Sequence, residues 1–252
     1  MAFDKKKRSE EKGPGARLTV VYDNNSMVGR LQTGKGFACL VEVGERTVLF
    51  NTGRQSDVLL NNMRALGIDP LEIESVLISN VHQDHLGGLT GFLECNPSVT
   101  VYVPESAPKE LTANIEKAGA KSPIRVSSPM ELCPDLFTLG ELKSFFDEQV
   151  LAIQTSPGLI LVTGCARPGI KSIWQQARSL FPDESIYLVL GGFHLGRLKD
   201  LEIAKTVDDF LKLEIKKVAP CHCSGQDARR FFEKAYGENF IRIGVGSVVE
   251  IC

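Results

Sequence analysis

The stretch VLISNVHQDHLGGL, residues 76–89, changes within a few positions from an apolar run to a cluster of ionisable side chains. The run VLIS is typical of a short buried strand, and the Gly-Gly pair lets the backbone turn sharply into a helix. His82, Asp84 and His85 are therefore expected in a loop at the carboxyl end of a strand, where their side chains can converge. Imidazole and carboxylate groups bind zinc and other divalent ions, so this loop is a candidate metal site.

Composition and charge argue against several classes of protein. With 252 residues, of which 43% are hydrophobic, the chain can bury the core of one large domain. Its 29 basic and 31 acidic residues leave no basic field for nucleic acid. No apolar run approaches the roughly 18–20 residues that span a bilayer, and no signal-peptide segment follows the N-terminus. We therefore expect a cytoplasmic protein with no membrane or nucleic-acid partner, whose seven cysteines are reduced.

The order of apolar segments predicts an α/β fold with two sheets. Residues 1–16 mix both charge signs around Gly-Pro-Gly and are expected to form a disordered tail, which leaves one domain over residues 17–252. Short apolar runs pair through tight turns, and too many consecutive strands lack a crossover helix for a doubly wound parallel sheet. The expected architecture is an αββα sandwich with helices on the outer faces. Helical patterns occupy residues 56–66, 107–118, 169–181, 201–214 and 225–236, the first with Ser56 as N-cap and Gly67 as C-terminal stop.

All histidines of the chain stand at the ends of predicted strands: His82, His85, His194 and His222. A core histidine bonded to a backbone carbonyl explains each one singly, but their shared position favours convergence on one pocket. Three cysteines adjoin these positions: Cys165, Cys221 and Cys223. They could bind a soft ion or be oxidised, although buried unreactive thiols are the commoner case.

Several motifs carry a resemblance to a known family. NVHQDHLGG resembles the H-x-H-x-D-H motif of the metallo-β-lactamase superfamily, and NTG at residues 51–53 resembles its D-T-G turn. Within the superfamily, VVYDNN, TGCARPGI, GGFHLG and PCHCSG are similar to the subfamily of dihydropterin ribofuranosylaminobenzene-phosphate synthase-like proteins. These matches extend from about residue 18 to residue 250, which covers nearly the whole expected domain.

The departures from the family pattern fall on metal positions. The family has histidine at the first motif position and after the TGC segment, where this chain has Asn80 and Arg167. It has aspartate in the D-T-G turn, where this chain has Asn51. The resemblance implies a first metal held by positions 80 and 82 with a later histidine, so this site is reduced to His82. It implies a second metal held by residues that are all retained: Asp84, His85 and His222.

We therefore expect one divalent ion, zinc by preference, with His82 or His194 completing its shell. The expected function is that of a metal-dependent, hydrolase-like or transferase-like enzyme with a mononuclear site. Its substrate would be a small anion, such as a phosphorylated compound, with Asp84 and His194 in catalysis. Substrate-binding roles are expected for Arg167, Asn80 and Asn25.

One alternative stays open at this stage: Arg167 pairs with Asp84, no metal binds, and the chain is a non-catalytic sensor or small-ligand-binding protein derived from such an enzyme. Separately, Lys35, in the segment QTGKGFA, is placed to reach a phosphate, although a glycine-rich turn with one lysine is usually only a turn.

Overall fold

The structure, a computed structural model, describes residues 14–252 and contains two mixed sheets. The first four strands of the first sheet pair antiparallel with one another, two of them joined by a tight turn at residues 44–45, and the remaining pairs are parallel. Its strands, in spatial order, are β13 (Val248–Ile251), β1 (Ala16–Tyr22), β2 (Ala38–Val43), β3 (Arg46–Phe50), β4 (Ser75–Leu77), β5 (Thr100–Pro104) and β6 (Ile124–Val126).

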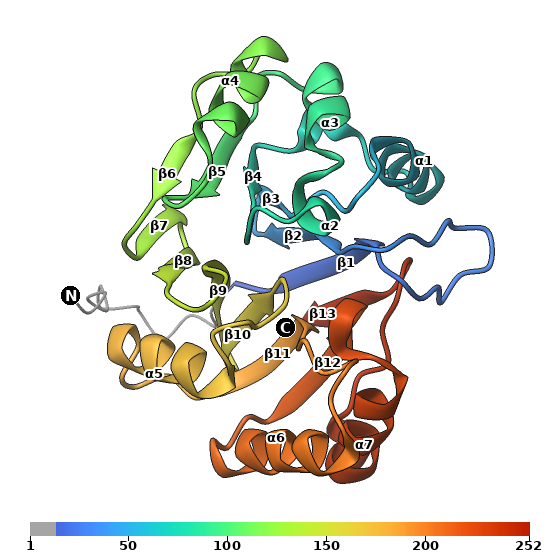
Figure 1. Cartoon of the computed structure of the whole chain (residues 1–252), viewed down its shortest axis with the longest axis vertical. Helices are drawn as coiled ribbons and strands as arrows, with labels where there is room; N and C mark the ends of the chain where they lie inside the picture. The colour runs from blue at the N-terminus through green and yellow to red at the C-terminus, as the bar shows by residue number, and fades with distance from the viewer. Residues whose placement is uncertain (1–13) are drawn as a thin grey trace.

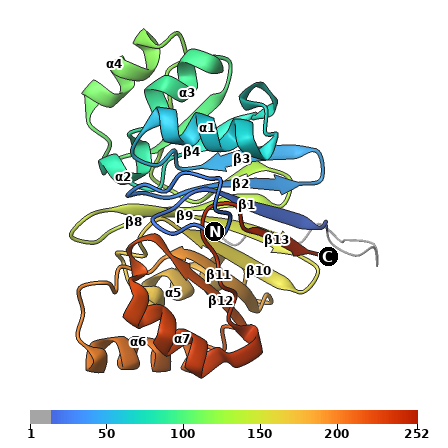
Figure 2. The ribbon, with the colours of Figure 1, turned by 90° about the vertical axis from the view of Figure 1, so that its right-hand side faces the viewer.

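The second sheet pairs three parallel strands with an antiparallel meander. Its strands, in spatial order, are β12 (Lys217–Cys221), β11 (Ile186–Gly192), β10 (Gly158–Thr163), β9 (Glu148–Thr155), β8 (Leu136–Leu142) and β7 (Met130–Cys133). The two sheets pack face to face in the middle of the molecule (Figure 2).

Helices cover both outer faces, as Figures 1 and 2 show. The first sheet carries α1 (Ser56–Leu66), α3 (Leu89–Cys95) and α4 (Lys109–Lys117), and the second carries α5 (Ile170–Leu180), α6 (Asp200–Lys212) and α7 (Gln226–Tyr236). The remaining helical turns are α2 (Gln83–Leu86) and the 3₁₀ segments Pro70–Glu72, His222–Ser224 and Gly237–Asn239. One apolar cluster lies between the sheets and one beneath each helical layer. The αββα sandwich expected from the sequence is confirmed.

The helix ends follow local chemistry with small differences from expectation. Helix α1 is capped by Gln55, so Ser56 is its first residue and not its N-cap. Gly67 ends the helix in the left-handed region (φ 73°), where a residue without Cβ is not strained. Ala16 already lies in β1, one residue before the expected start of the domain, and residues 1–13 of the predicted tail lie outside the described part.

The sequence pattern did not single out β7, β8 and β13. β8 is interrupted by a change of register between Thr138 and Glu141, where Gly140 takes a positive φ of 79°. An irregular strand of this kind loses the strict alternation by which strands are recognised. Within residues 14–252, no helix has both the length and the apolar character that crossing a membrane requires.

We expect the layer between the sheets to dominate stability. Leu188 lies on β11 in this layer and is fully buried, whereas Leu201 on α6 is 82% exposed. Leu188→Ala should lower the free energy of unfolding by about 2–5 kcal/mol, because it removes buried methyl groups and leaves a cavity. Leu201→Ala should change it by less than about 0.5 kcal/mol. Denaturant unfolding of both variants checks this, and equal effects would contradict the assigned layer.

Candidate functional site

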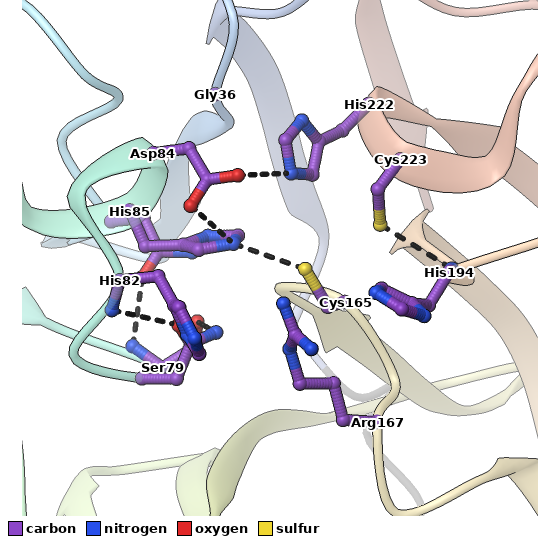
Figure 3. Close-up of polar contacts among 12 residues, drawn as sticks. Gly36, Ser79, His82, Asp84, His85, Cys165, Arg167, His194, His222 and Cys223 are labelled. Atoms are coloured by element: carbon purple, nitrogen blue, oxygen red, sulfur yellow. Dashed lines mark hydrogen bonds and ion pairs between the residues drawn. The ribbon is translucent and has the colours of Figure 1, made fainter. Parts of the chain in front are cut away.

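The candidate site lies where the carboxyl ends of strands from both sheets meet. Loops after β4, β10, β11 and β12 supply most of its side chains, and the loop after β1 closes one side. Figure 3 shows the side chains of the labelled residues from these strand ends pointing toward one another. The predicted convergence of the four histidines is therefore found: His82, His85, His194 and His222.

The centre of the site is a group of carboxylate, imidazole and thiol side chains. Asp84 Oδ2 lies 3.5 Å from His222 Nε2, and Asp84 Oδ1 lies 3.9 Å from His85 Nε2. His85 Nε2 is also 3.1 Å from Cys165 Sγ (Figure 3). Possible ligand atoms of His85, Cys165 and His222 all lie within 4.8 Å of one another, and all three residues are buried. Nitrogen and sulfur atoms are donors that divalent transition ions accept, so this group is a candidate metal centre.

The charges in this group are strongly coupled. Burial opposes ionisation of His222, but Asp84 and Cys165 outweigh it and raise the pKa of His222 to about 9. Partial burial likewise opposes ionisation of Asp84, yet His222 holds the pKa of this carboxyl well below its usual range. Hydrogen bonding with Cys223 and burial raise the pKa of Cys165. Near neutral pH, the metal-free site therefore contains a His222 imidazolium beside an Asp84 carboxylate, and a thiol at Cys165.

Two histidines can present a free Nε2 to the cavity. Asn24 Oδ1 accepts the backbone N–H of Gly36 at 3.0 Å, so the same oxygen accepts from His222 Nδ1 at 2.9 Å. Asn80 Oδ1 accepts the backbone N–H of His82 at 3.1 Å and its Nδ1 at 2.8 Å. In a neutral ring the lone pair is then on Nε2.

One buried nitrogen of this group, Nε2 of His222, indicates whether a metal ion fits here. His222 Nε2 is buried and, apart from its 3.5 Å ion-pair contact with Asp84 Oδ2, has no hydrogen-bond partner among residues 14–252. An orphaned buried nitrogen that faces a carboxylate fits a metal ion as its missing partner.

Glu148 holds the loop that carries Cys165 and Arg167. This fully buried side chain accepts the backbone N–H groups of Cys165 (2.7 Å) and Ala166 (3.1 Å) on Oε1, and that of Arg167 (2.9 Å) on Oε2. Burial raises the pKa of Glu148, while the three N–H donors act in the opposite direction. The carboxylate thus fixes the loop without contributing a group to the cavity.

A cavity of about 610 Å³ opens above the central group and is bordered by three cations. Lys35, Arg167 and Arg197 line it, and Asp84 is its one acidic residue. No ion pair joins Arg167 to Asp84 within the described residues; the guanidinium lies 4.8 Å from the ring centre of Phe146. The wall of the cavity is therefore suited to an anion.

A second cavity, of about 620 Å³, adjoins the first. Phe146, Arg167, His194 and Leu198 border both cavities. The second is lined mainly by apolar side chains, and Phe145 at its rim is 92% exposed. Aromatic side chains so exposed next to a polar site commonly contact a ligand.

The structure places the predicted residues in three groups. His82, Asp84, Arg167, His194 and His222 line the anion cavity, and His85 lies buried beneath it. Asn80 and Asn25 are not among the residues that line it: Asn80 is buried and binds His82, and Asn25 is bonded to Asp23 and Gln226.

The neighbour of Asn25, Asn24, lines the cavity instead. Sequence reasoning also missed Arg197 and Glu148. Arg197 follows the strand-end motif GGFHLG, which is a usable signal, whereas nothing near Glu148 in the sequence marks its role.

Comparisons with known proteins agree with this fold. Residues 32–149 match the metallo-β-lactamase superfamily. A Methanocaldococcus jannaschii protein, 7,8-dihydropterin-6-methyl-4-(β-D-ribofuranosyl)-aminobenzene-5′-phosphate synthase, is 30% identical, with 85% of this chain and 89% of that one covered. The structure of a metal-dependent hydrolase of the β-lactamase superfamily superimposes with a TM-score of 0.77 at 29% identity, covering 94% of this chain and 99% of the other. Human tRNase Z, short form, shares the fold alone, with a TM-score of 0.64, 12% identity, and coverage of 94% and 99%.

We expect Glu148→Gln to destabilise the protein. The amide keeps the shape of the side chain, but its NH₂ group must face a backbone N–H that now has no acceptor. The free energy of unfolding should fall by about 1–3 kcal/mol, measured by denaturant unfolding. Glu250→Gln, at an exposed site, serves as the control and should change it by less than about 0.5 kcal/mol. A neutral effect of Glu148→Gln would mean that the loop is held by other contacts.

Proposed function

Because this chain belongs to the metallo-β-lactamase superfamily, we propose that it is an enzyme that uses one divalent metal ion on a small anionic substrate. The observation that carries this proposal is the cavity in which three cations surround the carboxylate, imidazole and thiol group. The relative from Methanocaldococcus jannaschii is named for a product with a 5′-phosphate, which supports a phosphorylated substrate here.

The ion belongs beside Asp84 and His222. Asp84 is ionised and offers two oxygens, and His222 Nε2 lacks another partner within residues 14–252. His82 and Cys165 line the same cavity and offer a further nitrogen and a sulfur donor. Zinc suits a set of nitrogen, oxygen and sulfur ligands. A divalent ion at this position acts as a Lewis acid toward a phosphoryl or carbonyl oxygen.

The chain's own side chains bind and orient the substrate. Arg167 offers a planar fork of donors to a phosphate or carboxylate, and Lys35 and Arg197 add charge on other sides. The apolar cavity next to Arg167 favours a substrate whose remaining part is hydrophobic or aromatic. Phe146 borders both cavities and packs against His82 and the Arg167 guanidinium, so it would lie between the two parts of such a substrate.

His194 supplies a group for proton transfer. Burial and the charge of Arg167 lower the pKa of His194 below its ordinary value, so the ring is neutral near pH 7. A neutral imidazole at the border of both cavities can take a proton from a reacting group and return it.

A small-ligand-binding protein without catalysis is the second candidate. It is favoured by Asn80, whose amide is committed to Ser79 and His82 where the family places a metal ligand. It is also favoured by Arg167, whose permanent charge repels a second dication. Metal analysis separates the two candidates.

We expect about one zinc ion per chain after expression with zinc, measured by mass spectrometry of the metal. His222→Ala should lose it, because about one of four bonds to the ion disappears. The apparent zinc affinity should rise about tenfold per pH unit between pH 7 and 9, since the ion displaces the His222 proton. Circular dichroism checks that the variant is folded. Two tightly bound ions would contradict the mononuclear site, and none would favour the binding protein.

We expect Arg167→Ala to weaken binding of inorganic phosphate by roughly 1.5–3 kcal/mol, the range of a hydrogen bond to a charged group. Calorimetric titration of the zinc-loaded protein measures this. Arg64→Ala, an exposed change on α1, should leave phosphate binding unaltered. If Arg167→Ala loses the metal instead, Arg167 supports the pocket wall and does not bind the anion.

A further inference from the structure

His85 is the one histidine of the site with no exposed surface, and each of its ring nitrogens has a partner. Nδ1 lies 3.0 Å from Asn51 Nδ2, and Nε2 lies 3.1 Å from Cys165 Sγ. Because a neutral imidazole has one N–H and one lone pair, these contacts determine which nitrogen carries the proton. Which ring nitrogen of His85 carries the proton depends on how the Asn51 amide is oriented.

A backbone group fixes that orientation. The N–H of Ser79 donates to Asn51 Oδ1 at 2.7 Å, so the amide oxygen must face Ser79 and the NH₂ group must face His85. Rotating the amide by half a turn would put two donors against each other at this short distance in a fully buried place. Asn51 itself is held, since its own N–H donates to Leu77 and its backbone is left-handed (φ 60°).

The proton of His85 is therefore on Nε2. Asn51 Nδ2 donates to Nδ1, which must therefore be an acceptor, so the N–H of the ring is on Nε2. The remaining N–H points at Cys165 Sγ, with Asp84 Oδ1 3.9 Å away. His82 and His222 differ from it, because in both rings Nδ1 is a donor, to Asn80 Oδ1 and Asn24 Oδ1 respectively.

We propose that Asn51 makes His85 a hydrogen-bond donor to Cys165 and so keeps His85 Nε2 from binding a metal ion. A nitrogen that carries a proton has no lone pair for a metal, and moving that proton to Nδ1 would set it against the Asn51 NH₂ group. The metal-excluding role rests on the proposed metal function, but the position of the proton does not.

An aspartate at position 51 would act in the opposite way. A carboxylate can accept both the Ser79 N–H and a proton on His85 Nδ1, which leaves Nε2 free to bind the ion. The family pattern has aspartate at this position. The NH₂ group that replaces one carboxylate oxygen therefore decides whether His85 of this chain is a ligand. Asn51 is thus a positioning residue, which touches neither the ion nor the substrate.

Nitrogen NMR of the metal-free protein tests the proton position directly. Long-range ¹⁵N–¹H correlations distinguish Nδ1–H from Nε2–H rings, and His85→Gln assigns the signal. We expect His85 as Nε2–H in the wild-type protein and as Nδ1–H in Asn51→Asp. An Nδ1–H ring in the wild-type protein overturns the proposal.

Zinc titration tests the consequence. Asn51→Asp should bind zinc about 10–100-fold more tightly than the wild type, the size of effect typical of groups that orient a ligand. Asn80→Asp is the matched control: it adds the same charge to a buried site nearby, but His82 Nδ1 already donates to this side chain, so no tautomer changes. Equal gains in the two variants would mean a simple charge effect and overturn the proposal.

A third comparison does not depend on the folding of Asn51→Asp. In the wild-type background, His85→Gln should leave zinc affinity within about threefold, whereas His222→Gln should reduce it by about 100-fold or more. Equal losses in these two variants would make His85 a ligand and overturn the proposal. Absence of zinc from both the wild type and Asn51→Asp would end the proposed metal function and the metal-excluding role together, while the NMR result would still locate the proton.

Discussion

The site depends on backbone that L-residues rarely adopt, held in place by buried polar side chains. Four residues around it have positive φ without being glycine: Asn51 (60°), Ala166 (53°), His194 (54°) and His222 (49°). Each such residue costs on the order of 1–3 kcal/mol, so the surrounding structure must hold it. Glu148 does this for Ala166, and Asp23, also fully buried, accepts the backbone N–H of His222 at 2.8 Å. The functional side chains are thus positioned by carboxylates that do not enter the cavity.

This arrangement explains how much of the site could be predicted. The strand-end position of the histidines follows from local sequence, because an apolar run ahead of a polar loop marks the carboxyl end of a strand, and their convergence was confirmed. The αββα architecture could be predicted for a similar reason. Asp23 and Glu148 could not be recognised, because a buried carboxylate that binds backbone groups leaves no periodic signal. That Asn24, and not the predicted Asn25, lines the cavity could not be read from the sequence, because the direction of a side chain in an irregular loop is set by tertiary contacts.

Two departures from the family pattern have a clearer meaning in the structure than in the sequence. Asn80 could be read from the sequence only as a missing metal ligand, yet its amide orients His82 through two hydrogen bonds. Arg167 was expected either to clamp an anion or to pair with Asp84, and it lies over Phe146 between the two cavities. Both residues therefore make specific contacts in this chain, Asn80 with His82 and Arg167 with Phe146.

The charge of the cavity links metal and anion binding, but only weakly. The metal-free site already holds the Lys35, Arg167 and Arg197 cations, and its Asp84 carboxylate is balanced by the His222 imidazolium. A divalent ion that displaces this proton raises the net charge by one unit only. Loss of one arginine lowers it by the same amount and also removes directed hydrogen bonds. Anion affinity should therefore depend on the arginines at least as much as on the metal, and the distinct contribution of the ion is to polarise the bound group.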